Sequence, residues 1–124
     1  KSRENKNYLP GCRIPLHVKI TSSLETAVKG AGCVILCTPS HAVEAMAESL
    51  VPWLEKDTVV VCASKGLADH AGHRLSEVIK DKVKDITKKI VVLSGPNHAE
   101  EVGRVRPSPL PKCRKRCRWY RTFS

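Results

Sequence analysis

Three uninterrupted runs of apolar residues constrain the fold of this chain more than any other feature of its sequence. They cover residues 33–38, 58–63 and 90–93, and a segment of helical character follows each run. Continuous rather than alternating hydrophobicity predicts strands that are buried on both faces, as in a parallel sheet. Strands that alternate with helices join through right-handed crossovers, so the sequence predicts an α/β fold with a doubly wound parallel sheet.

The segments between the runs carry apolar residues three and four positions apart, which predicts helices that pack one face on the sheet. The first of these helices opens near Ser40. Upstream, residues 17–21 alternate like a short strand. Ser22 and Glu25 have the spacing of a capping box for a short helix that ends at Gly30.

Most of the net charge of +10 lies at one end of the chain. Of the 22 Lys and Arg residues, 8 lie after residue 103, where no acidic residue occurs, which leaves 14 basic against 12 acidic residues in the body. Prolines at 107, 109 and 111 interrupt any helix or central strand in this tail. We therefore expect a partial domain over 1–103 and a basic tail over 104–124 that is disordered or translated out of frame. The nearly neutral body argues against a nucleic-acid partner, although a tail that binds nucleic acid remains a remote alternative.

The remaining composition favours a cytoplasmic protein without a metal site. The apolar runs are far shorter than the roughly 20 residues that a membrane span requires. The six cysteines include no CxxC pair, and Cys33, Cys37 and Cys62 lie inside apolar runs. Thiols in such positions are expected to be buried, reduced and structural, which fits a reducing compartment.

Three loops should meet at one edge of the predicted sheet. They begin at Thr38, Ala63 and Ser94, and they are rich in small or polar residues. Ligands of open parallel sheets bind at the carboxyl ends of the strands. Lys65 follows the second run directly, where its ammonium group could meet a phosphate, and Gly95 would let a ligand approach the backbone. The alternative interpretation is a solvated lysine in an ordinary strand–turn–helix connection.

The residues of these loops also resemble one family. Asn-Tyr-Leu-Pro-Gly at residues 7–11, Thr-Pro-Ser-His at 38–41, Ala-Ser-Lys-Gly-Leu at 63–67 and Leu-Ser-Gly-Pro-Asn-His-Ala-Glu-Glu-Val at 93–102 occur in this order. In order and spacing they are similar to the bacterial NAD(P)-dependent glycerol-3-phosphate dehydrogenases, over roughly residues 1–103. The resemblance implies an incomplete Rossmann-type domain with NAD or NADP as cofactor.

The resemblance also implies an activity and a set of contacts. The whole protein would interconvert sn-glycerol 3-phosphate and dihydroxyacetone phosphate for glycerophospholipid synthesis. Tyr8, Lys65 and Ala99 match cofactor-binding positions of the family, and Lys65, Gly95 and Asn97 match substrate-binding positions. Asparagine departs from the serine or threonine that is usual in the family at residue 97.

Other family features have no counterpart in the 124 residues. The glycine-rich phosphate turn would precede Lys1, and the acid/base lysine would lie in a helical domain after residue 103, so we assign no catalytic residue and expect the chain alone to be inactive. Another dehydrogenase of the same fold, acting on a small phosphorylated or hydroxy-acid substrate, is the alternative function. Whether the whole protein forms a homodimer is left open.

Overall fold

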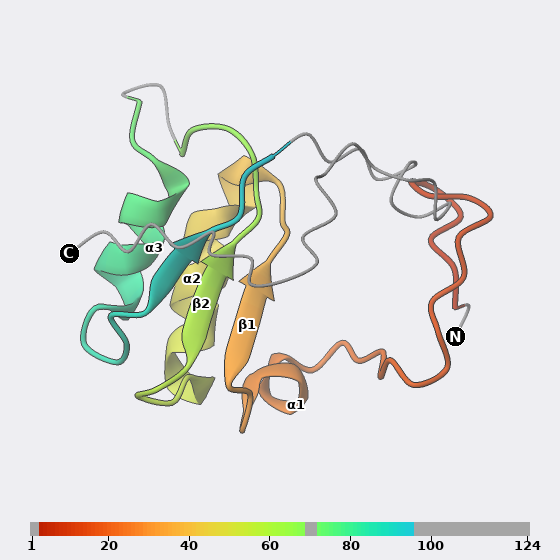
Figure 1. Cartoon of the computed structure of the whole chain (residues 1–124), viewed down its shortest axis with the longest axis horizontal. Helices are drawn as coiled ribbons and strands as arrows, with labels where there is room; N and C mark the ends of the chain where they lie inside the picture. Colours follow the sequence, from red (N-terminus) through yellow and green to blue (C-terminus); the bar gives the residue numbers. More distant parts are fainter. Residues whose placement is uncertain (1–2, 69–71, 96–124) are drawn as a thin grey trace, which may run out of the picture. The chain divides into compact units, whose positions relative to one another are not determined.

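The computed structural model describes residues 3–68 and 72–95, which fall into two units. Among the described residues, the first unit holds residues 3–20 and Gly95, and the second holds residues 21–68 and 72–94. The second unit contains every helix and strand of the described part (Figure 1). None of these helices is long and apolar enough to cross a membrane.

A parallel three-stranded sheet forms the centre of the second unit. Its strands are β1 (Cys33–Leu36), β2 (Val59–Cys62) and β3 (Ile90–Val92), in the order β1-β2-β3. Cys33 lies opposite Val59, and Val60 lies opposite Ile90. All three strands point to the same edge, as Figure 1 shows. The α/β class and the parallel sheet predicted from the apolar runs are confirmed.

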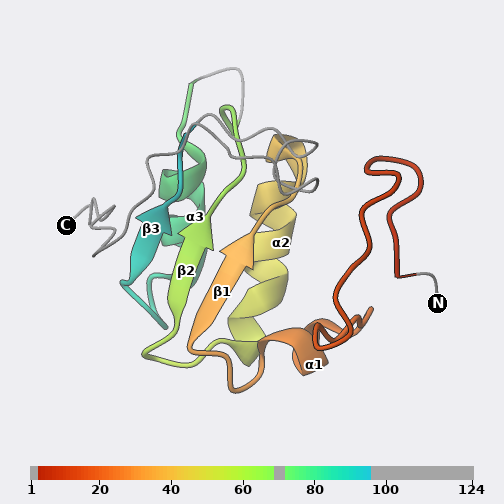
Figure 2. The ribbon, with the colours of Figure 1, turned by 45° about the vertical axis from the view of Figure 1, so that its right-hand side comes forward.

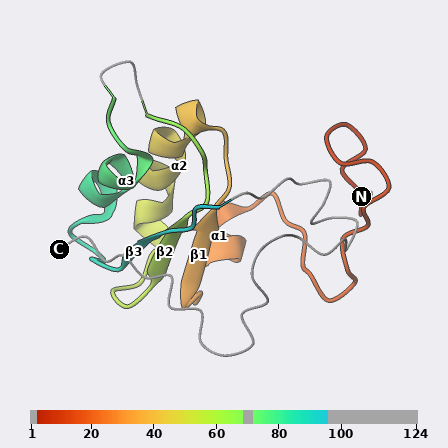
Figure 3. The ribbon, with the colours of Figure 1, turned by 45° about the horizontal axis from the view of Figure 1, so that its top comes forward.

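Two helices cover one face of the sheet. They are α2 (Val43–Leu50), which a 3-10 turn at Ser40–Ala42 precedes, and α3 (Leu75–Val83). Figures 2 and 3 show both helices on the same side of the strands. Their buried residues meet those of the strands in one core, which includes Val43, Ala47, Leu50, Val60, Cys62, Ile79 and Val83. The helical spacing in the sequence therefore identified the packing faces correctly.

The expectation that the strands are buried on both faces is wrong for the described part of the chain. Ile35 is 58% exposed, and Cys33 and Cys37 are exposed as well, whereas Leu36 is 4% exposed. Alternate side chains of a strand point to opposite faces, and the described helices cover one face. Of the three thiols that we expected to be buried, Cys62 alone is, at 1% exposure.

The segment before β1 differs from the sequence prediction in two details. Helix α1 (Leu24–Val28) is capped by Ser23, whose hydroxyl accepts a hydrogen bond from the Thr26 N–H at 3.2 Å, and not by Ser22. Gly30 ends it with a φ of +76°, as expected. Residues 17–21 form no strand, because the Val18 N–H bonds to Pro15 within a turn and the segment is exposed.

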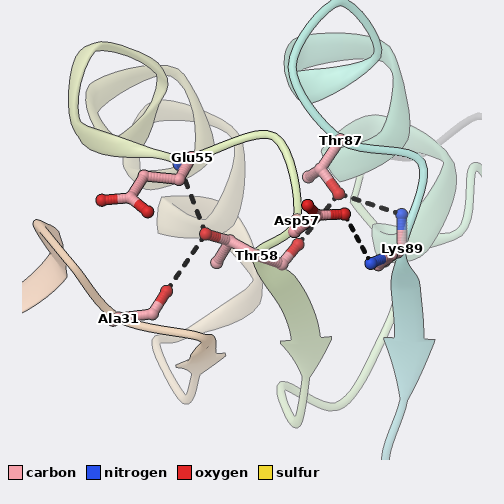
Figure 4. Close-up of polar contacts among 6 residues, drawn as sticks. All are labelled: Ala31, Glu55, Asp57, Thr58, Thr87 and Lys89. Atoms are coloured by element: carbon pink, nitrogen blue, oxygen red, sulfur yellow. Dashed lines mark hydrogen bonds and ion pairs between the residues drawn. The ribbon is translucent and has the colours of Figure 1, made fainter.

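Two buried threonines hold the amino ends of the strands together (Figure 4). The Thr58 hydroxyl donates to the Ala31 carbonyl at 3.1 Å and accepts from the Glu55 N–H at 3.3 Å. The Thr87 hydroxyl donates to the Thr58 carbonyl at 2.9 Å. Each threonine is 2% exposed, so these bonds satisfy polar groups that water does not reach. We call Thr58 and Thr87 the threonine clamp.

Candidate functional site

The loops that leave β1 and β2 are joined at the carboxyl edge of the sheet, opposite the threonine clamp. The Ser64 hydroxyl donates to the Thr38 carbonyl at 2.6 Å. The Ala63 N–H donates to the Leu36 carbonyl at 2.9 Å, and the Leu93 N–H continues the ladder to the Cys62 carbonyl at 2.8 Å. The predicted convergence of the strand ends is therefore present in the described residues.

A cavity of about 430 Å³ lies at this edge. Its walls come from the β2–α3 loop, the first turn of α3 and the residues that end β3. The polar side chains among them are Ser64, Lys65, Arg74, Ser76 and Ser94. A concave site of this size, lined by apolar residues and a few polar groups, is typical of small-molecule pockets.

Gly66 lines this cavity from the β2–α3 loop. Its φ is +104°, a conformation that side chains other than hydrogen resist. A Cβ placed on Gly66 would lie 3.6 Å from the Cβ of Ser40, which is ordinary contact. Glycine is thus required here by the backbone conformation rather than by lack of space.

Lys65 lies on the wall of the cavity with its side chain exposed, as the sequence analysis anticipated. After Gly66 the chain turns back on itself, because Leu67 and Arg74 form an antiparallel bridge and the Ala68 N–H donates to the His73 carbonyl at 2.9 Å. The bridge places Arg74 on the same cavity, a residue that the sequence analysis missed.

The other predicted contacts lie in the first unit or outside the described residues. Tyr8 belongs to the first unit, where its ring is 83% exposed and its N–H donates to Asn5 Oδ1 at 3.1 Å. Gly95 also belongs to the first unit and directly follows Ser94 in the chain. Asn97 and Ala99 lie outside the described residues.

The cavity wall also contains Cys62, and burial raises the pKa of its thiol above the usual value. A thiol with a raised pKa stays protonated near neutral pH and is a poor nucleophile. Within residues 3–68 and 72–95, no group of three or more His, Cys, Asp or Glu side chains is arranged to hold a metal ion. The chemistry that this edge offers is therefore cationic and hydroxylic, which suits an anionic ligand.

Comparison with known proteins gives one consistent result. The family model described as NAD-dependent glycerol-3-phosphate dehydrogenase N-terminus matches residues 1–111. The match runs through residues 104–111, beyond the boundary at 103 expected from composition.

Individual relatives agree with the family model. Glycerol-3-phosphate dehydrogenase [NAD(P)+] of Moorella thermoacetica is 50% identical over 107 residues, which are 86% of this chain and 31% of the relative. The enzyme of the same name from Syntrophomonas wolfei is 40% identical over 89% of this chain and 32% of the relative. The chain thus spans about a third of the length of the curated relatives that it matches.

Solved structures share the fold. The crystal structure of glycerol-3-phosphate dehydrogenase from Coxiella burnetii matches with a TM-score of 0.73 and 26% identity, over 83% of this chain and 31% of that one. A structure from Dunaliella salina, named DsGPDH, matches with a TM-score of 0.70 and 27% identity, over 83% of this chain and 18% of that one.

Proposed function

This chain belongs to the family described as NAD-dependent glycerol-3-phosphate dehydrogenase N-terminus, and from that membership we propose that it binds NAD or NADP. We propose further that the whole protein transfers a hydride between sn-glycerol 3-phosphate and this cofactor, with dihydroxyacetone phosphate as the oxidised product. In the reducing direction the product is sn-glycerol 3-phosphate, which would feed glycerophospholipid synthesis. The observation that carries the proposal is the position of Lys65 on the cavity at the carboxyl edge of the sheet.

The residues present suit a phosphorylated ligand. Both the cofactor and the substrate carry phosphate groups, and Lys65, Ser64 and Ser94 all line the cavity. A lysine acts on a phosphate as a point charge on a flexible stem, so one ammonium can serve two neighbouring ligands. When bound, the nicotinamide supplies the acceptor for the hydride. Lys65 would orient the phosphorylated substrate and balance its charge while that transfer occurs.

The contacts expected from the family resemblance complete the proposal. Lys65 would touch both the cofactor and the substrate phosphate. Tyr8 and Ala99 would contact the cofactor, and Gly95 and Asn97 would contact the substrate. The small-molecule substrate is the sole partner that the proposal requires, and we further propose a cytoplasmic homodimer for the whole protein. The exposed thiols of Cys33 and Cys37 support a reducing compartment, and sedimentation velocity tests the dimer.

The activity is best tested in a chimera, because the chain spans 31% of its Moorella thermoacetica relative. Residues 1–95 of this chain would replace the matching segment of that enzyme. The chimera should oxidise NADH or NADPH with dihydroxyacetone phosphate and should not accept pyruvate or oxaloacetate. Activity with a keto acid but not with dihydroxyacetone phosphate would contradict the proposal.

Lys65→Gln tests the central residue of the proposal. Loss of a charge-assisted bond is worth about 1.5–3 kcal/mol, so kcat/KM should fall about 10- to 100-fold. Lys29→Gln is the matched control, since Lys29 is exposed at the end of α1 and pairs with Glu25 at 3.4 Å. Equal kcat/KM values for the two variants would remove Lys65 from the site.

A further inference from the structure

An arginine side chain holds together the irregular segment over residues 3–18 of the first unit. All of these residues are described, and they form no helix and no strand of the sheet. The Arg3 guanidinium donates from Nε to the Ile14 carbonyl at 3.2 Å and from Nη2 to the Val18 carbonyl at 2.5 Å. The same Nη2 donates to the Pro15 carbonyl. One side chain therefore satisfies three backbone carbonyls that no helix or sheet bonds.

Short-range bonds close part of this segment into a loop that carries Tyr8. Glu4 and Arg13 form an antiparallel bridge, and the Glu4 carboxylate accepts a hydrogen bond from the Gly11 N–H at 2.8 Å. We call residues 4–13 the tyrosine loop. Compact surface loops whose ends lie close together are frequently functional.

Polar bonds, and not an apolar core, give this segment its order. None of residues 3–18 is buried, and none belongs to the hydrophobic core of the described chain. Hydrogen bonds from a charged donor are roughly twice as strong as neutral ones, so the guanidinium of Arg3 provides the strongest bonds available here. Removal of this group should therefore loosen the segment, whereas the sheet of the second unit keeps the core that stabilises it.

Resting on the function proposed above, we propose that Arg3 is a positioning residue for binding of the cofactor. Tyr8 is the group that would touch the cofactor, and Arg3 acts through the segment that carries it. Its guanidinium would order the tyrosine loop in advance, so that less entropy is lost when the cofactor binds. A loop that is ordered only part of the time binds its ligand more weakly in proportion to that fraction. Arg3 would thus set the affinity for the cofactor and not the rate of hydride transfer.

Amide hydrogen exchange in the full 124-residue chain, followed by two-dimensional NMR, tests the ordering. The variants are Arg3→Gln and Arg3→Lys. The control is Arg13→Gln, which removes the same charge from the same segment while the backbone of residue 13 keeps the bridge to Glu4. Arg3→Gln should speed exchange of the bonded Gly11 and Ile14 N–H groups about 10-fold and leave the amides of β2 unchanged. Arg3→Lys, which keeps a charged donor, should lie between.

The chimera described above gives the functional readout. Arg3→Gln should raise the Kd for NADH, measured from the fluorescence of the bound cofactor, about 10-fold and leave kcat nearly unchanged. Arg3→Lys should recover part of that affinity. Arg13→Gln should change neither value, because its exposed side chain carries the same charge without the carbonyl bonds of Arg3.

Each outcome decides the inference. Faster exchange in the tyrosine loop together with a raised Kd for NADH supports it. Unchanged exchange, an equal loss in Arg13→Gln, a fall in kcat at unchanged Kd, or no binding of NADH by the unmodified chimera overturns it. If the β2 amides show that Arg3→Gln does not fold, Arg3→Lys must show the intermediate loss.

The two readouts of the chimera separate this inference from the proposed function. A chimera that reduces dihydroxyacetone phosphate with an unchanged Kd for NADH after Arg3→Gln refutes the role of Arg3 and leaves the function intact. A chimera that binds NADH but does not reduce dihydroxyacetone phosphate, and whose Kd rises after Arg3→Gln, refutes the function and leaves the positioning role intact.

Discussion

Thr58→Val tests whether hydrogen bonding or burial dominates at the threonine clamp. Valine has nearly the shape of threonine but lacks the hydroxyl, so the Ala31 carbonyl loses its donor and the Glu55 N–H loses its acceptor. Thr58 is 2% exposed, and Ala31 is half-buried. Glu55 is exposed, so its N–H can form a hydrogen bond with water instead. The half-buried carbonyl of Ala31 is therefore left without its donor, and the expected loss of unfolding free energy is about 2 kcal/mol.

Thr58→Ser is the matched control, because it keeps the hydroxyl and removes one buried methyl group. That change should cost about 1 kcal/mol. The predicted order of stability is therefore wild type, then Thr58→Ser, then Thr58→Val. If burial of apolar area dominated, the order of the two variants would be reversed, since valine is the more apolar residue.

Urea unfolding followed by circular dichroism measures both variants against wild type. In thermal unfolding of a folded unit of this size, a loss of about 2 kcal/mol corresponds to a fall in Tm of about 8–16 °C. The slope of the urea transition should stay constant, which shows that stability has changed and not the extent of unfolding. A Thr58→Val protein as stable as Thr58→Ser would refute the reasoning.

Three further predictions concern other parts of the second unit. Gly66→Ala should lower stability by about 1 kcal/mol or more in urea unfolding because φ is +104° there, whereas Gly32→Ala, at ordinary φ with open space around it, should change it little. The pKa of the Asp57 carboxyl is lowered by the hydrogen bond and the charge of Lys89. The stability that this carboxylate adds is therefore present above about pH 4 and is lost as the pH falls through the lowered folded-state pKa. Below that pH, the unfolding midpoints of Asp57→Asn and wild type should converge. Iodoacetamide followed by mass spectrometry should label exposed Cys33 rapidly near neutral pH and Cys62 only after unfolding, because burial excludes the reagent and raises the pKa of the Cys62 thiol; equal labelling rates would contradict this.

The sequence predicted what depends on local pattern and composition. Runs of apolar residues located β1, β2 and β3, and helical spacing located α2 and α3, because these periods reflect which side chains the core must bury. Which face of a strand is covered depends on tertiary placement. A continuous run such as residues 33–36 therefore could not show that Ile35 would be exposed. The strand predicted over residues 17–21 does not form for a related reason, since alternation specifies a strand only where another strand is present to pair with it.

The position of Lys65 in the fold was predicted because the order of the chain alone determines it. Lys65 lies at a strand end, and any parallel sheet places that end at the ligand-binding edge. Arg74 is nine positions further along the chain, and its approach to the cavity depends on the backbone bridge to Leu67. Such a bridge leaves no periodic signal in the sequence. Charged residues that reach a site through a closed loop are thus found by structure rather than by motif.

The clamp and the candidate site lie at opposite edges of the same sheet, so stability and binding can be varied independently. Thr58→Ser should lower the unfolding midpoint without altering the affinity for glycerol 3-phosphate, because the residue is at the amino end of β2 and the cavity is at its carboxyl end. Lys65→Gln should lower that affinity and leave the midpoint nearly unchanged, since Lys65 is exposed on the cavity at the carboxyl edge. If each variant lost both stability and ligand affinity, the two edges of the sheet would be energetically coupled. Independent losses would show that weaker binding in Lys65→Gln reports the missing ammonium group and not a loosened fold.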